Sequence, residues 1–268
     1  MLLTHAGRGL AAVLTVCVLG LSASGCGGGT TQRPKPDPLA TALAQLGTLS
    51  EKLEVVPEKL DSDGTTIIVG DPEALVTVHL YEDPRCPVCQ EFELTGGGPP
   101  LRVLTEWGVT KTEYTFASFL DDRAGGSGSK KAVNALRAAL EAGKFAEYHA
   151  LLYQHQPEES VDGYTDAYLL ELADKVEGLR GPEFDTAVRT MKYRDFVTRS
   201  EQAYERADED DTRGPGTPTV LIDDVLIPEE HRWVLFDREA FGRLLVTIRT
   251  QPWRWVGPLT DGLPLDDD

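Results

Sequence analysis

The sequence is poor in cysteine and in positive charge, and it lacks a membrane-spanning segment. Its 268 residues include four Cys, and 26 Lys and Arg stand against 44 Asp and Glu, giving a formal net charge of −18. So acidic a chain is a poor candidate for binding nucleic acid, or for binding anionic lipid through a basic patch. After Arg8 no stretch is long and apolar enough to cross a bilayer.

Metal-ligand patterns are lacking as well. The chain has one C-x-x-C motif, at Cys86 and Cys89, and no second pair to complete the four ligands of tetrahedral zinc. Four histidines show no metal-ligand spacing: His79, His149, His155 and His231. We therefore expect neither a metal nor a cofactor.

The N-terminal segment accounts for the other two cysteines. Arg8 precedes an apolar run from 10 to 21, and small residues follow up to Cys26. This pattern predicts a signal peptide over 1–25. The ending Leu-Ser-Ala-Ser-Gly-Cys resembles a bacterial lipobox, which implies cleavage before Cys26 and lipidation of its thiol, with Cys17 removed. The alternative is a plain secretory signal in which Cys26 is incidental.

The most informative motif is Cys86-Pro87-Val88-Cys89. It follows an alternating apolar run from 75 to 81, which predicts a strand, and it precedes a segment that can form a helix. Pro87 fits the first helical turn, and the positive end of a helix dipole favours a thiolate there. Strand, C-x-x-C and helix in this order indicate a redox dithiol. A structural short-loop disulfide is the alternative.

The rest of the chain predicts an α/β domain with a helical insertion. Beta-like patterns cover 65–69, 75–81, 109–119, 219–222 and 225–228, and helical patterns cover 132–142, 145–154, 166–176, 182–190, 193–207 and 238–248. Residues 121–129, rich in Gly and Ser, are predicted to be a loop. The predicted organisation is a signal peptide over 1–25, a tether over 26–64, a domain over 65–129 and 210–250, an insertion over 130–209, and a tail over 251–268.

Three motifs make the chain resemble the DsbA-like branch of the thioredoxin superfamily, of the type found in actinobacterial lipoproteins. They are Asp-Pro-Arg-Cys-Pro-Val-Cys at 83–89, the helical segment 143–153, and Gly-Pro-Gly-Thr-Pro-Thr followed by an apolar run at 214–222. The resemblance implies a thioredoxin-like fold with a helical insertion. It also implies a cis bond between Thr217 and Pro218, facing the dithiol, where a substrate chain could pair with the backbone.

The motif also predicts roles for its residues. Cys86, as the more exposed member, is expected to bond to substrate, and Cys89 to resolve that bond. Pro87 and Val88 are expected to tune how oxidising the disulfide is, because they fix the backbone and the hydrogen bonds around the sulfur. The family's strongest oxidants carry His where this chain has Val88, so we expect a milder oxidant.

One position departs from the resemblance. Many thioredoxin-like proteins carry a buried carboxylate six residues before the first Cys, where this chain has Leu80. Asp83 matches a family Asp, whereas Glu82 is expected to be a solvated charge. Arg85, next to Cys86, could add to the stabilisation of the thiolate, although an exposed Arg would contribute little in screened solvent.

These features favour a membrane-tethered, extracytoplasmic thiol–disulfide oxidoreductase that forms disulfides in secreted proteins. The expected partners are secreted or cell-envelope proteins, an unidentified membrane redox partner, and the membrane itself through lipid on Cys26. No nucleic acid is expected, and the protein is expected to be a monomer. Two alternatives stay open: a disulfide reductase or isomerase, and a non-catalytic thioredoxin-fold lipoprotein acting as an interaction module.

Overall fold

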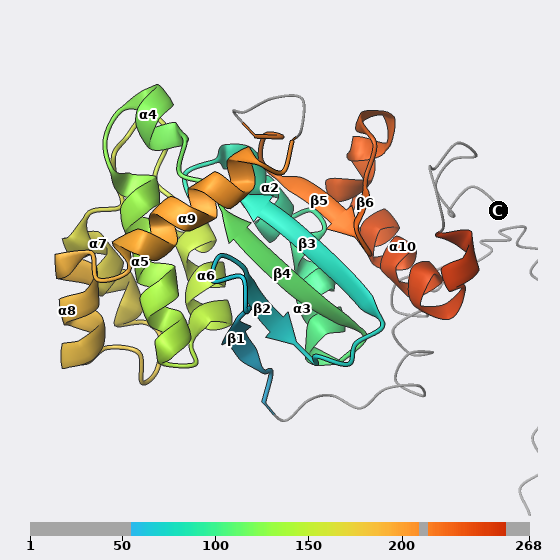
Figure 1. Cartoon of the computed structure of the whole chain (residues 1–268), viewed down its shortest axis with the longest axis horizontal. Helices are drawn as coiled ribbons and strands as arrows, with labels where there is room; N and C mark the ends of the chain where they lie inside the picture. Colours follow the sequence, from blue (N-terminus) through green and yellow to red (C-terminus); the bar gives the residue numbers. More distant parts are fainter. Residues whose placement is uncertain (1–54, 209–213, 256–268) are drawn as a thin grey trace, which may run out of the picture. The chain divides into compact units, whose positions relative to one another are not determined.

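A mixed six-stranded sheet forms the centre of the computed structural model, which describes residues 55–208 and 214–255. The strand order is β1-β2-β4-β3-β5-β6 (Figure 1). Strands β3 and β4 are parallel, and the other neighbours are antiparallel. The strands are β1 (Glu58–Leu60), β2 (Ile67–Gly70), β3 (Val76–Glu82), β4 (Thr110–Phe116), β5 (Thr219–Ile222) and β6 (Val225–Leu226).

The alternation of β3 explains its central place. Val76, Val78, Leu80 and Glu82 are buried on one face, while the residues between them are partly exposed on the other. Leu80 lies opposite Tyr114 of β4 and Val220 of β5. Because β3 pairs on both sides, the residues at its carboxyl end are held firmly in place.

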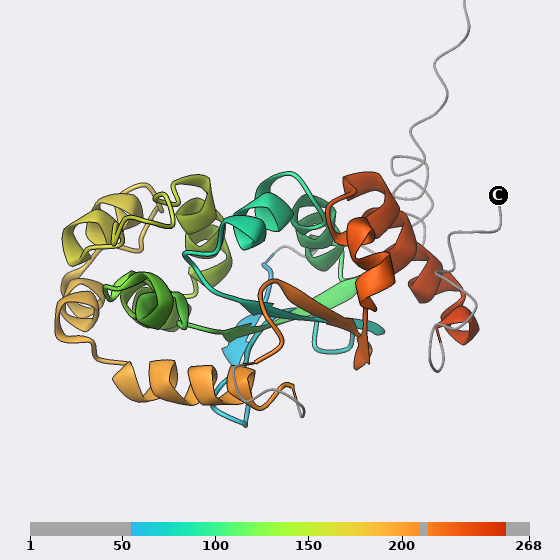
Figure 2. The ribbon, with the colours of Figure 1, turned by 90° about the horizontal axis from the view of Figure 1, so that it is seen from above.

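Helices cover both faces of the sheet (Figure 2). Helix α3 (Gly98–Glu106) and helix α10 (Arg238–Thr250) lie on the face that receives Leu80, and α9 (Arg194–Glu205) packs on β4 from the other. Helix α2 (Pro87–Leu94) follows β3 and packs against α3. The 3-10 segments η1 (Glu229–Leu235) and η2 (Pro252–Arg254) flank α10.

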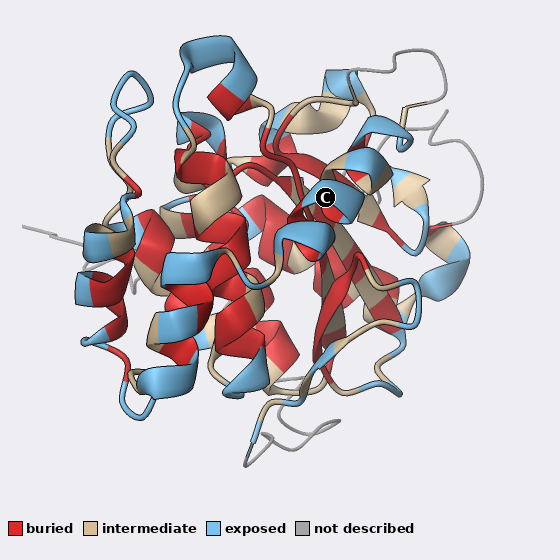
Figure 3. Cartoon of the chain, turned by 60° about the vertical axis from the view of Figure 1, so that its left-hand side comes forward, coloured by how far each residue is buried: buried red, intermediate tan, exposed pale blue. Residues whose placement is uncertain are grey.

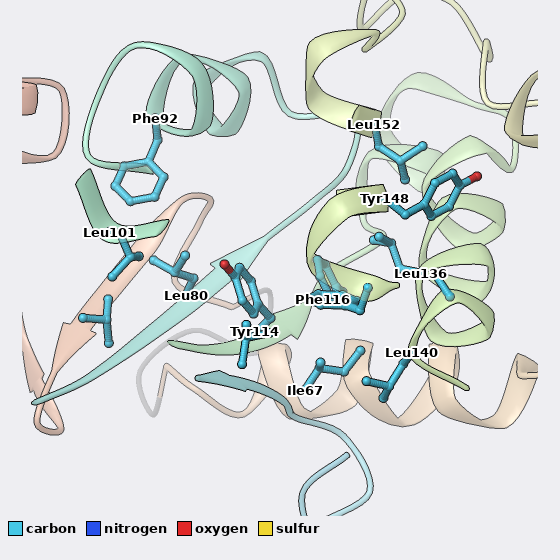
Figure 4. Close-up of a cluster of buried hydrophobic side chains, with 14 of the residues drawn as sticks. Ile67, Leu80, Phe92, Leu101, Tyr114, Phe116, Leu136, Leu140, Tyr148 and Leu152 are labelled. Atoms are coloured by element: carbon cyan, nitrogen blue, oxygen red, sulfur yellow. The ribbon is translucent and has the colours of Figure 1, made fainter. Parts of the chain in front are cut away.

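The insertion shares one apolar core with the sheet. Its helices are α4 (Leu120–Ala124), α5 (Gly128–Glu141), α6 (Phe145–Gln154), α7 (Asp166–Ala173), α8 (Pro182–Thr190) and α9. Tyr114 and Phe116 of β4 meet Phe145 of α6, with ring centroids 5.3 and 6.0 Å from that of Phe145. Figure 4 shows Tyr114 and Phe116 in one apolar cluster with Leu136 and Leu140 of α5. The buried sides of the helices face inward and the exposed sides outward (Figure 3).

Three details differ from the predicted boundaries. Strand β1 lies within the predicted tether and pairs with β2, so the folded part begins before residue 65. The predicted loop 121–129 overlaps most of helix α4 and the first two residues of helix α5. In the predicted tail, Trp255 is buried and its indole N–H donates to the Ile222 carbonyl at 2.8 Å, whereas Trp253 is exposed.

The five strands and the insertion helices predicted from sequence are present, with ends that shift by a few residues. Within the described residues, no helix combines the length and apolar character needed to span a bilayer. Cys26 and the predicted signal peptide lie outside those residues.

Candidate active site

The C-x-x-C motif lies where β3 turns into α2. Cys86 is the N-cap of α2 and Pro87 is its first residue, where a missing N–H leaves no helical bond unmade. The turn is closed by two backbone bonds: Cys86 N–H donates to the Asp83 carbonyl at 2.9 Å, and Gln90 N–H donates to the Cys86 carbonyl at 3.1 Å. The first thiol therefore lies at the positive end of the helix.

A distant segment of the chain completes the site. The peptide bond between Thr217 and Pro218 is cis, and Pro218 directly precedes β5. The Cys86 thiol donates to the Thr217 carbonyl oxygen at an Sγ–O distance of 3.4 Å. Pairing of β5 with β3 brings these segments together, although they are 131 residues apart in sequence.

The two thiols differ in their electrostatics. The pKa of Cys86 is lowered to about 6, chiefly by a hydrogen bond from the Cys89 thiol and further by the backbone N–H groups of Val88 and Cys89, against the opposing effect of burial. Cys86 is 6 % exposed and Cys89 is 0 % exposed. Burial raises the pKa of Cys89 well above its ordinary value, and the neighbouring Cys86 and Glu82 raise it further. At neutral pH the reduced site therefore pairs one thiolate with one thiol.

The loop before Cys86 is held by buried polar contacts. Asp83 accepts from the Ser129 hydroxyl at 2.6 Å and from the Leu120 N–H at 3.1 Å. Burial raises the pKa of Asp83 to about 7. These bonds tie the end of β3 to the first helices of the insertion.

The assumption that Arg85 is solvent-exposed, which would limit its effect on the thiolate, is wrong. Its guanidinium is buried, donating to Asp121 Oδ1 at 2.9 Å and to the carbonyl oxygens of Gly125 and Glu159 at 2.9 and 2.8 Å. The backbone turn before Cys86 directs Arg85 into the insertion rather than toward the sulfur. Arg85 therefore anchors the loop, and a buried pair of this kind is costly to break.

Helix α6 and the residues after it make contacts with the motif that no sequence pattern predicts. Gln156, just after α6, donates from Nε2 to the carbonyl oxygens of Pro84 and Cys86 at 2.8 and 3.0 Å. Gln90 Nε2 donates to the Tyr153 carbonyl at 3.0 Å. Neither a glutamine within a helix nor one just after a helix carries a recognisable motif, and only the packing of α6 on α2 gives the two a role.

The prediction that Glu82 is a solvated charge is also wrong. Glu82 ends the buried face of β3 and is 0 % exposed, because residues two apart on a strand share a face. His149 Nε2 of α6 lies 2.9 Å from Glu82 Oε2. Burial raises the pKa of Glu82 to about 8, and the negative charge of Cys86 raises it further.

Ligand atoms of Glu82, Glu93 and His149 lie within 4.8 Å of one another, a spacing compatible with a metal ion. Arg102 already donates to Glu93 and supplies positive charge at this place. We therefore treat the group as an internal polar cluster.

Comparison with known proteins identifies the family of this chain. The family model described as Thioredoxin matches residues 62–238, more than half of the chain. No curated protein sequence matches. The chain therefore belongs to the thioredoxin family.

Solved structures show the same fold. MdbA from Corynebacterium diphtheriae, described as a thiol-disulfide oxidoreductase, is 23% identical over 68% of this chain and 94% of that chain, with a TM-score of 0.55. BdbD from Bacillus subtilis is 18% identical over 75% of this chain and 99% of that chain, with a TM-score of 0.57. DsbA from Chlamydia trachomatis is 18% identical over 68% of this chain and 91% of that chain, with a TM-score of 0.54. The predicted thioredoxin-like fold with a helical insertion is confirmed.

The thiol asymmetry predicts selective alkylation. In the reduced protein, iodoacetamide should modify Cys86 with a half-maximal rate near pH 6, because the pKa of this thiol is about 6 and the thiolate is the reactive form. Cys89 should stay unmodified at pH 7, which peptide mass spectrometry would establish. A Cys86→Ser variant, which leaves Cys89 as the only thiol of the motif, is the control, and Cys89 in it should be almost unreactive. Half-maximal reaction near the ordinary thiol value of about 8.5 would contradict the assignment.

Proposed function

We propose that the protein is an extracytoplasmic thiol–disulfide oxidoreductase that forms disulfides in secreted proteins through Cys86 and Cys89. The observation that carries this proposal is the pairing of a low-pKa thiol at a helix N-cap with a buried high-pKa thiol one turn on. The fold and the thioredoxin-family membership support it.

The reaction begins from the Cys86–Cys89 disulfide. A substrate thiolate attacks Cys86 Sγ, the bond to Cys89 breaks, and the Cys89 sulfur leaves with the electron pair and takes a proton. A second substrate thiolate then attacks the substrate sulfur bonded to Cys86. The substrate gains a disulfide and loses two electrons, and the protein is left with a Cys86 thiolate and a Cys89 thiol.

Stabilisation of the Cys86 thiolate decides whether the pair oxidises or reduces its substrate. Lowering the pKa of this thiol favours the reduced form of the pair, so the disulfide becomes a stronger oxidant and Cys86 a better leaving group. Val88 lies between the cysteines, is 37 % exposed, and has no polar atom to stabilise the sulfur. The pair is therefore a milder oxidant than relatives with His at this place.

The surface beside the thiol suits an extended, partly apolar substrate segment. The Thr217 backbone at the cis-Pro218 turn lies next to Cys86, where a substrate strand could pair with it. A shallow groove of about 820 Å³ begins at Val88 of the motif and is lined by Val88, Trp233 and Phe236 with charged residues around them. Trp233 is half exposed and offers an aromatic contact.

A membrane tether through lipidated Cys26 completes the proposal. The lipobox-like sequence supports it, and the acyl chains would keep the domain at the outer surface of the cell membrane. An unidentified membrane redox partner would restore the Cys86–Cys89 disulfide after each turnover.

Oxidative folding tests the activity. The oxidised protein should restore activity to reduced, unfolded ribonuclease in the absence of other oxidants, at up to one substrate disulfide per protein. Cys86→Ser should abolish this transfer, because no sulfur remains for the substrate to attack. Cys89→Ser, reduced and mixed with a disulfide-bonded substrate, should accumulate a mixed disulfide on non-reducing gels, because the resolving thiol is missing. Oxidative folding that persists in Cys86→Ser would refute the proposal, and strong insulin reduction without oxidative folding would identify a reductase.

Fractionation tests the tether. In an actinobacterial host, the full-length protein should incorporate labelled fatty acid and sediment with membranes. Cys26→Ala should lose the label and appear in the soluble fraction, whereas Cys17→Ala, within the predicted signal, should behave like the wild type. Membrane association that survives Cys26→Ala would contradict lipidation at this residue.

A further inference from the structure

One face of helix α9 reaches the end of the sheet that carries the active site. Ser200, Glu201 and Tyr204 lie three or four residues apart, so they share this face. Ser200 Oγ accepts from the N–H of Phe116, the last residue of β4, at 2.8 Å. Glu201 Oε2 accepts from the Ser118 hydroxyl, also at 2.8 Å. The face therefore rests on the end of β4 and on the residues that follow it.

The last side chain of this face, Tyr204, contacts the segment 214–218 that leads into β5, which we name the proline turn. The Gly216 N–H donates to the Tyr204 hydroxyl oxygen at 3.1 Å. Gly214 lies against the ring of the same tyrosine, where an added Cβ would be 2.4 Å from Tyr204 Cε1. The φ angle of Gly214 is also positive, at 80°. Both the close approach and the backbone conformation therefore require glycine at this contact.

Aromatic neighbours hold the Tyr204 ring in place. The ring is stacked on that of Phe119, with centroids 5.5 Å apart and planes at 16°. Tyr81 of β3 is a second neighbour at 6.4 Å, and Tyr81 is itself stacked on His79 at 4.4 Å. The Arg123 guanidinium lies over the other aromatic partner, Phe119, at 4.6 Å from its centroid. Because Tyr204 is 1 % exposed, this row of rings fixes the position of its hydroxyl.

The contacts of Tyr204 lead to the dithiol by two routes. Phe119 packs against the small apolar cluster that contains both cysteines. Gly216 directly precedes Thr217, whose carbonyl oxygen accepts from the Cys86 thiol at 3.4 Å. The amide held by Tyr204 is therefore one residue away from the carbonyl that faces the sulfur.

Other hydrogen bonds shape the proline turn without tying it to the insertion. The Thr219 hydroxyl donates to the Gly216 carbonyl at 3.0 Å, a contact between the turn and the strand that follows it. Arg232 Nη2 reaches the Pro218 carbonyl at 3.5 Å, the limit of a hydrogen bond. Among the residues that the structure describes, the bond to Tyr204 is the one hydrogen bond that joins the insertion to the backbone of the turn.

We propose that Tyr204 is a positioning residue of the active site, which holds the proline turn where an extended substrate chain pairs with it beside Cys86. The proposal rests on the proposed function, because only a protein that binds substrate segments at this turn needs such a support. Pairing contributes most to binding when the backbone of the turn is already in place. A small thiol meets only the sulfur and gains nothing from the turn. Helix α9 thus acts on substrate binding without touching the substrate.

Two substrates of different size separate this role from the chemistry at the sulfur. The oxidised protein is mixed in single turnover with dithiothreitol or with an unfolded peptide that carries two cysteines. Either substrate passes two electrons and two protons to the Cys86–Cys89 disulfide and forms its own disulfide. Acid quenching, thiol trapping and mass shift give the two rate constants. A wild type that oxidises dithiothreitol but not the peptide would sink the proposed function, and the role of Tyr204 with it.

Tyr204→Phe removes the hydroxyl and keeps the ring. With the peptide, the rate constant should fall about threefold to tenfold, the size expected for one hydrogen bond. With dithiothreitol it should stay unchanged. Tyr148→Phe is the matched control, because it removes another buried hydroxyl of the insertion, which donates to the Leu169 carbonyl at 2.8 Å. This control should leave both rate constants unchanged.

Gly214→Ala tests the same contact from the side of the turn. The added methyl group would collide with the Tyr204 ring and displace the turn. The peptide rate constant should fall at least as far as in Tyr204→Phe, with no change for dithiothreitol. In this variant the bond to Gly216 is already broken, so adding Tyr204→Phe should cause no further loss. The two losses should therefore not multiply, as they would for independent sites.

Three results would overturn the role of Tyr204 while leaving the proposed function intact. The first is an unchanged peptide rate constant in Tyr204→Phe. The second is equal slowing with both substrates, which would indicate damage around the sulfur rather than at the turn. The third is a selective peptide defect of the same size in Tyr148→Phe. If thermal unfolding shows that Gly214→Ala is misfolded, the comparison of Tyr204→Phe with Tyr148→Phe decides.

Discussion

The structure depends on the placement of a thiol at the first turn of α2, directly after a strand paired on both sides. The N-cap position surrounds the Cys86 sulfur with the backbone N–H groups of Val88 and Cys89, and these lower the pKa of Cys86 with the Cys89 thiol. A thiolate stabilised by one further pKa unit is worth about 1.4 kcal/mol, or about 30 mV in the potential of a two-electron couple. The local geometry of one helical turn therefore sets the redox character of the site.

The insertion helices have a part in the chemistry as well as in the core. Through Gln156 and Gln90, α6 and the residues after it fix the motif from one side, and Arg85 anchors the loop before Cys86 to the insertion from the other. His149 of the same helix reaches the acid at the end of β3. One helix thus positions the sulfur and also contacts the groups behind it, so a change in α6 would act on both.

Much of the fold could be predicted because its signals are local. The alternation of β3, the Pro at the start of α2 and the Gly-Thr-Pro-Thr before β5 each specify a nearby conformation, and the pairing of β5 with β3 brings the dithiol and the cis-Pro turn together. Short elements were missed: β1 has three residues and α4 has five, too few for periodicity to register. The burial of Glu82 and Arg85 could not be predicted, because a charged residue near a strand end usually lies in solvent. Their burial follows from the insertion packing over them, which no local pattern encodes.

The measurement that tests this account most directly is the equilibrium reduction potential of the Cys86–Cys89 pair in glutathione buffers, read by mass shift after thiol trapping. The stabilised Cys86 thiolate predicts an oxidising pair, with a potential above about −180 mV. A value near about −270 mV would place the pair with thioredoxin-like reductants and contradict the account, because the structural asymmetry of the two thiols would then not favour the reduced form.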